Sequence, residues 1–78
     1  MTLQDIKEDA MTLGFKGNLS HINRLADKVY ANPARVYELM QEYGIGADSV
    51  IREKLFSYIA DKYHDGDYNK VYDKWIKS

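Results

Sequence analysis

The chain has 78 residues, of which 45% are hydrophobic and 29% are charged, and its formal net charge at pH 7 is −1. This length allows one domain with one core, and the hydrophobic content argues against disorder. The absence of cysteine excludes disulfides and thiolate metal sites. The near-neutral charge disfavours a general nucleic-acid binder, because phosphate contacts dominate such binding, although a local basic face would be enough.

The sequence contains no membrane or export signal that we recognise. No apolar run approaches the roughly 20 residues that span a bilayer. The acidic first ten residues lack the apolar stretch of a signal peptide. We therefore expect a soluble, cytoplasmic protein without a membrane partner.

The first segment predicts a helix, because its apolar residues recur at helical spacing. This helix is expected over residues 3–13, with Thr2 as its cap. Gly14 is the expected end, because glycine adopts the left-handed conformation at low cost. Phe15 is expected to fold back onto the core.

The middle of the chain predicts two packed helices, over residues 20–30 and 33–43, with a tight joint between them. Ser20 is the expected cap of the first helix. Asn32 followed by Pro33 is a strong helix start, because asparagine caps free N–H groups and proline lacks the N–H that would have no partner there. Apolar residues share one face of each helix: Ile22, Leu25, Ala26 and Val29, then Val36, Leu39, Met40 and Tyr43.

Two further helices are expected, over residues 49–63 and 68–77. Asp48 or Ser49 can cap the first of them, and Asp67 the second. No stretch shows sustained alternation of period two, so no sheet is expected. The predicted fold is all-α, a single compact domain of about five short helices with a central helix-turn-helix unit.

Residues 22–41 resemble the helix-turn-helix segment of small bacterial and phage DNA-binding proteins. That family has a small residue where the two helices cross, which Ala26 supplies. It also has aliphatic residues between the helices, here Leu25, Val29, Val36 and Leu39. The run that begins at Ala31 is similar to the polar-Pro-x-x-Val start of many recognition helices. The chain departs from the family at Tyr30, where a glycine is usual in the turn.

The resemblance implies a transcription-associated regulator that binds double-stranded DNA, with the helix over residues 33–43 in the major groove. The outward residues of that helix would be Asn32, Ala34, Arg35, Tyr37, Glu38 and Gln41. The residues that would contact phosphates are Ser20, His21, Arg24 and Lys28. A homodimer is expected, because one such helix makes few contacts. Glu38 and Glu42 offset the positive charge of Arg35, which is unfavourable for a helix that enters a DNA groove. The competing interpretation is that these are two ordinary core helices with no role in DNA binding.

The last helix indicates a function of another class. Its apolar stripe contains Tyr72 and Trp75, and tyrosine and tryptophan are enriched at interface hot spots. With Lys70 and Lys74 on another side, these residues would form the binding surface of a small regulator or inhibitor of a partner protein, of the kind that phages and mobile elements encode. The competing interpretation is that the rings close the core and the lysines form a solvated face.

No catalytic, metal or cofactor site is expected. Asp65 and Asp67 have the spacing of a calcium loop, but Lys70 and Ile76 stand where such a loop has glycine and glutamate. The segment before Ser49 resembles the site where carrier proteins take a phosphopantetheine arm, but the helix after it is mixed in charge instead of acidic. No nucleophile has a matched base, so we expect no enzyme.

Overall fold

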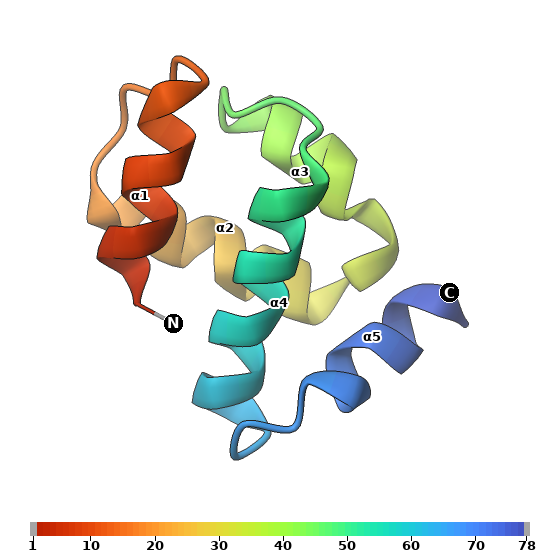
Figure 1. Cartoon of the computed structure of the whole chain (residues 1–78). Coiled ribbons are helices and arrows are strands. Elements are labelled where there is room, and N and C mark those ends of the chain that lie inside the picture. The colour runs from red at the N-terminus through yellow and green to blue at the C-terminus, as the bar shows by residue number, and fades with distance from the viewer. Residues whose placement is uncertain (1, 78) are drawn as a thin grey trace.

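The computed structural model of the chain describes residues 2–77, and helices are the only regular secondary structure in that range. This confirms the predicted all-α fold. No helix within the range is long and apolar enough to cross a membrane. Five α-helices and one 3₁₀ segment follow each other there as α1 (Leu3–Thr12), α2 (Leu19–Ala31), η1 (Pro33–Arg35), α3 (Val36–Glu42), α4 (Ser49–Tyr63) and α5 (Tyr68–Ile76) (Figure 1).

The helix α4 lies at the centre of the fold and packs against α1, α2 and α5. Its fully buried side chains include Ile51, Leu55 and Ile59, which are spaced one helical turn apart. Burying an aliphatic side chain of this kind contributes roughly 1.5–3 kcal/mol to the free energy of unfolding. The core around them includes Ile6, Ala10, Ile22, Leu25, Val29, Val36, Met40, Phe56 and Val71.

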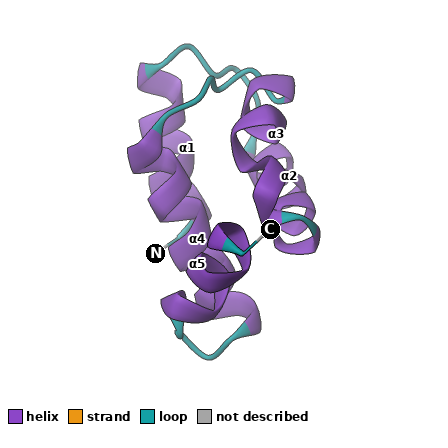
Figure 2. Ribbon diagram, turned by 90° about the vertical axis from the view of Figure 1, so that its right-hand side faces the viewer, coloured by secondary structure: helices purple, strands orange, loops and turns teal. Residues whose placement is uncertain are grey.

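The helices α1 and α3 end in the same way, and the loops that follow them lie side by side at one end of the molecule (Figures 1 and 2). Gly14 and Gly44 follow these helices with φ of +97° and +80°, a conformation that glycine adopts without strain. The next N–H groups, of Phe15 and Ile45, donate to the carbonyl five residues earlier, at 3.1 and 3.0 Å. Both side chains are buried, so the predicted helix end at Gly14 and the return of Phe15 to the core are confirmed.

The cap of α2 differs from the prediction. The helix starts at Leu19, and Asn18 is its cap, because the Asn18 backbone is extended and its side chain accepts from the His21 N–H at 3.2 Å. Ser20 lies inside the first turn and donates its hydroxyl to the Asn18 side chain at 2.6 Å. The predictions of Thr2 as the cap of α1 and Asp48 as one of two candidates for α4 are confirmed, because both side chains accept a backbone N–H.

The helix start predicted at Asn32 is wrong in two respects. The Asn32 side chain makes no cap hydrogen bond, and the Asn32 backbone N–H completes the end of α2. The Asn32 carbonyl then accepts from the Arg35 N–H at 3.1 Å, which closes a 3₁₀ turn that begins with buried Pro33. The α-helix therefore starts only at Val36. Asp67 likewise makes no side-chain cap bond at the start of α5.

One flank of α4 carries polar side chains that bond to α1 and α2. Residues 54, 58 and 62 are spaced one turn apart, which places them on one face of the helix. Their partners follow in order along that face: Lys54 pairs with Asp9, Tyr58 donates to Asn23 and Lys62 pairs with Asp27. This polar row links α4 to both α1 and α2.

The other flank of α4 holds α5 through a cation and two aromatic rings. The Arg52 guanidinium lies 4.3 Å from the centre of the Trp75 ring, and the Arg52 side chain is only 12% exposed. Its Nη1 donates to the Tyr37 hydroxyl at 2.9 Å, which links α4 to α3 as well. The Trp75 ring also meets Phe56 edge-on, with centroids 5.7 Å apart. Contacts of both kinds are favourable beyond the area they bury.

We expect Trp75→Ala to lower the free energy of unfolding by about 2–3 kcal/mol, below the range for fully buried tryptophan because part of the ring is exposed. The loss should be measured by urea denaturation followed by circular dichroism. Lys70→Ala on the exposed side of α5 is the control and should leave the urea midpoint unchanged. An unchanged midpoint for Trp75→Ala would mean that this ring does not hold α5 in place.

A second prediction concerns the pH dependence of stability at the junction between α2 and α4. The Tyr63 hydroxyl, which donates at 2.6 Å, and then Lys62 hold the pKa of Asp27 below its ordinary value. A lowered native pKa gives stability that is complete above the unfolded pKa of about 3.9 and is lost as the pH falls through the native value. Asp27→Asn should therefore be less stable than the wild type at neutral pH.

The stability difference between the wild type and Asp27→Asn should shrink as the pH falls below about 4, the ordinary range of an aspartate. Urea midpoints at several pH values measure this convergence. Asp73→Asn removes an exposed carboxylate from α5 and serves as the control. A gap for Asp27→Asn that stays constant across this pH range would contradict the assigned role of the carboxylate.

Candidate nucleic-acid interface

The packed pair formed by α2 and η1–α3 has the apolar faces that the sequence predicts. Ala26 is fully buried. It stands where helix-turn-helix proteins have a small residue in the first helix. The aliphatic residues that the resemblance assigns to the space between the helices are also buried: Leu25, Val29, Val36 and Leu39. Tyr43, at the end of the second face, is half-buried. The outward side of the pair therefore consists of the residues that lie between these buried positions in the sequence.

The joint between the two helices needs no glycine. Among residues 2–77, Asp65 is the one non-glycine residue with positive φ, so Tyr30 and its neighbours take no left-handed conformation. The departure from the family at Tyr30 therefore costs no backbone strain. The Tyr30 ring instead stacks on Tyr63 of α4, with centroids 3.9 Å apart and planes 8° apart. This stack joins the end of α2 to the end of α4.

Most of the predicted reading residues lie on the outer side of η1–α3. Asn32, Ala34, Arg35 and Gln41 are all exposed. Tyr37 differs from them, because its ring is half-buried and its hydroxyl accepts from Arg52. The side chain of Tyr37 is thus used to join α3 to α4.

The Arg35 guanidinium is held by acidic side chains of its own helix. Its Nε and Nη2 donate to the two carboxylate oxygens of Glu38 at 3.2 and 2.8 Å. Glu42 lies 3.7 Å away on the next turn. The hydrogen bond and charge of Arg35 lower the pKa of Glu38, and Glu38 in turn raises the pKa of Arg35. The same fork geometry that binds Glu38 is the one that would bind a guanine edge.

The predicted phosphate-contacting residues are distributed along α2. Ser20 and His21 are exposed at its first turn, where both bond to Asn18, with the Asn18 N–H donating to His21 Nδ1 at 3.1 Å. Arg24 is exposed one turn later. Lys28 is exposed near the end, where its ammonium lies 5.5 Å from the centre of the Tyr43 ring. The four residues thus line α2 from its start to its last turns.

An open depression of about 420 Å³ connects α2 to the outer side of α3. Sequence reasoning placed Lys28 and Arg35 in separate groups, but the structure brings both to this depression. Its lining consists of Lys28, Ala31, Asn32, Arg35, Leu39 and Glu42. No local sequence pattern could have predicted this lining, because it depends on how the two helices cross.

The aromatic stripe of α5 is packed mainly within the fold. The Tyr72 ring lies between Tyr68 and Trp75, with centroid distances of 6.0 and 5.6 Å, and both Tyr72 and Trp75 are half-buried. This packing favours the core-closing interpretation of the rings. Lys70 and Lys74 are exposed, and the Lys74 ammonium lies 5.6 Å from the centre of the Tyr30 ring. Since α5 also packs against η1, it brings Lys74 beside the joint of the helix pair.

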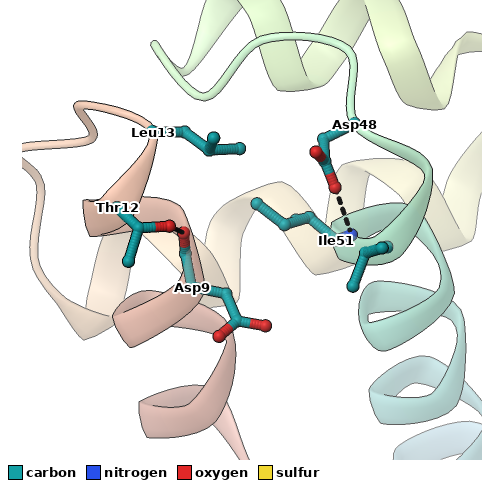
Figure 3. Close-up of a pocket in the computed structure, with 6 residues that line it drawn as sticks. Asp9, Thr12, Leu13, Asp48 and Ile51 are labelled. Carbon is teal, nitrogen blue, oxygen red and sulfur yellow. Dashed lines mark hydrogen bonds between the residues drawn. The ribbon is translucent and has the colours of Figure 1, made fainter.

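A second depression, of about 140 Å³, lies between the end of α1 and the start of α4 (Figure 3). Its two carboxylates already have partners, because Asp9 pairs with Lys54 and Asp48 accepts from the Ile51 N–H at 3.0 Å. No three His, Asp or Glu side chains of residues 2–77 are grouped as metal ligands would be. The rest of the lining is Thr12, Leu13, Val50 and Ile51.

Comparison with known proteins assigns this chain to no family. No family model, no curated protein and no solved structure matches it. The exposed residues of the α2–α3 pair and of α5 are therefore the features that bear on function.

Proposed function

We propose that the chain is a small transcription-associated regulator that binds double-stranded DNA through the outer side of α2, η1 and α3. The observation that supports this most directly is the exposure of Asn32, Arg35 and Gln41 on a helix pair whose inner aliphatic residues are buried. Asparagine, arginine and glutamine carry the donors and acceptors that read base edges in the major groove. A homodimer would double the number of such contacts.

The positions of the cations support the same face. Lys28 and Arg35 line one depression, and Lys74 of α5 lies beside the joint between the two helices. Arg24 is exposed one turn before Lys28 on α2. In this arrangement the lysines and Arg24 contact phosphates while residues of η1 and α3 enter the groove.

Binding requires Arg35 to change partners. In the free chain its fork is occupied by Glu38, and Glu42 lies close by. An exposed ion pair of this kind is weak, because water competes with it and salt screens it. A bidentate contact with guanine is stronger, because it forms in a partly desolvated groove. The exchange is therefore favourable on DNA, but the two glutamates reduce its gain.

The second candidate function is a protein-binding module that uses Lys70, Tyr72, Lys74 and Trp75. It is favoured by the partial exposure of the two rings beside two exposed lysines. The acidic residues around Arg35 also favour it, since they oppose entry of α3 into a negatively charged groove. The DNA experiments below separate the two candidates, because this module would not bind nucleic acid.

We expect Arg35→Ala to weaken DNA binding roughly 5- to 100-fold and Glu38→Gln to strengthen it, because the second change frees the guanidinium. Fluorescence anisotropy with labelled fragments of mixed genomic DNA at low salt measures both affinities. Lys7→Ala removes the same charge from α1 and is the control. If Arg35→Ala binds as tightly as Lys7→Ala, then Arg35 does not read DNA.

Salt dependence tests the phosphate contacts separately. For the wild type, the logarithm of the affinity should fall linearly with the logarithm of the salt concentration. Arg24→Ala and Lys28→Ala should each reduce the slope by about 0.9, as expected for one lost phosphate contact. If the wild type does not bind at all at low salt, the DNA proposal is excluded. Capture of a partner that is lost on changing Lys70 and Lys74 to glutamine would then support the second candidate.

A further inference from the structure

The depression between α1 and α4 is lined by three aliphatic and three polar residues, and the fold leaves it uncovered. Leu13 and Val50 on its wall are 48% and 56% exposed, while Ile51 beneath them is buried. Figure 3 shows Leu13 and Ile51 reaching into the space between the two helices. A space of about 140 Å³ with Leu13, Val50 and Ile51 on its walls is large enough to hold one small apolar group.

The rim of this depression is acidic. Asp9 pairs with Lys54, and Asp48 accepts from the Ile51 N–H, so each carboxylate uses part of its hydrogen-bonding capacity. A carboxylate has roughly four acceptor positions, so both can accept further donors. Residues 3–13 carry three acidic side chains and one lysine, so α1 as a whole is negatively charged. An apolar side chain flanked by cations is therefore the group that fits this surface.

The tip of α5 presents such a group. Ile76 is 58% exposed, the largest exposed fraction among the large hydrophobic residues of the described range. Lys77 follows it and Lys74 precedes it by two residues, and both are exposed. Figure 1 shows α5 and α1 on opposite sides of the molecule, with α4 between them. The tip therefore cannot reach the depression of its own chain, but it can reach that of a second copy.

We propose that copies of this chain associate head to tail, with Ile76 of one copy in the depression between Leu13 and Val50 of the next. Lys77 of the first copy then lies near Asp9 and Asp48 of the second. The two contacting surfaces differ, so each copy has one α5 tip and one depression available for a neighbour. The assembly therefore grows into open chains or closes into a ring. The contact is small and therefore weak. This proposal does not depend on DNA binding.

Sedimentation velocity of the full chain, at concentrations up to about 1 mM, tests the association because even a weak contact is populated there. The mass of the wild type should rise beyond that of a dimer. Leu13→Arg and Ile76→Gln should each weaken self-association at least tenfold. Leu19→Gln changes another exposed aliphatic residue, at the start of α2, and should associate as the wild type does. A wild type that stays monomeric over this range overturns the proposal.

Mixing the two variants gives the decisive result. Leu13→Arg keeps an intact tip and Ile76→Gln keeps an intact depression, so the mixture should form dimers and nothing larger. A mixture that stays monomeric while the wild type associates would overturn the proposal, as would a wild type that stops at a closed dimer. A mixture of Val50→Arg and Lys77→Glu repeats the experiment at other exposed positions. Circular dichroism shows whether each variant is folded, so the misfolding of one variant does not decide the result.

Discussion

The burial of α4 on more than one side is the constraint on which the rest of the structure depends. An amphipathic surface helix has one apolar stripe, but α4 must meet α1 and α2 on one flank and α5 on the other. It does so by combining aliphatic residues with long polar ones. Tyr58 and Lys62 end in hydrogen bonds to α2, and Arg52 ends among aromatic rings. The positions of the α2–α3 pair and of α5 are both set by this helix.

The parts of the fold that could be predicted from the sequence are those determined by local chemistry. Gly14 ends α1 because only glycine takes its φ without cost, and the five apolar periodicities give the five helices. The cap of α2 was missed because Asn18 and Ser20 both have capping side chains, and the extended backbone at Asn18 decides between them. The 3₁₀ turn at Pro33 was also missed, and its contact with α5 is one that no local pattern shows.

The candidate site also has parts that local sequence patterns could predict and parts that they could not. Exposure of Gln41 follows from the periodicity of α3, and Asn32 and Arg35, which precede that helix, are also exposed as predicted. The burial of Tyr37 could not be predicted, because its partner Arg52 lies 15 residues away on another helix. The depression that joins Lys28 to Arg35 depends on how the two helices cross, which no local pattern specifies. Contacts between helices therefore decide which of the predicted residues remain available to a partner.

The placement of Trp75 has a spectroscopic consequence. It is the single tryptophan of the chain, and its ring lies against Arg52 and Phe56 at the α4–α5 contact. Its fluorescence therefore reports whether α5 is docked, whereas the far-ultraviolet circular dichroism sums all the helices. Coincident melting curves from the two signals would mean that α5 unfolds together with the rest of the domain. An earlier fluorescence transition would identify α5 as a separate, less stable cooperative unit.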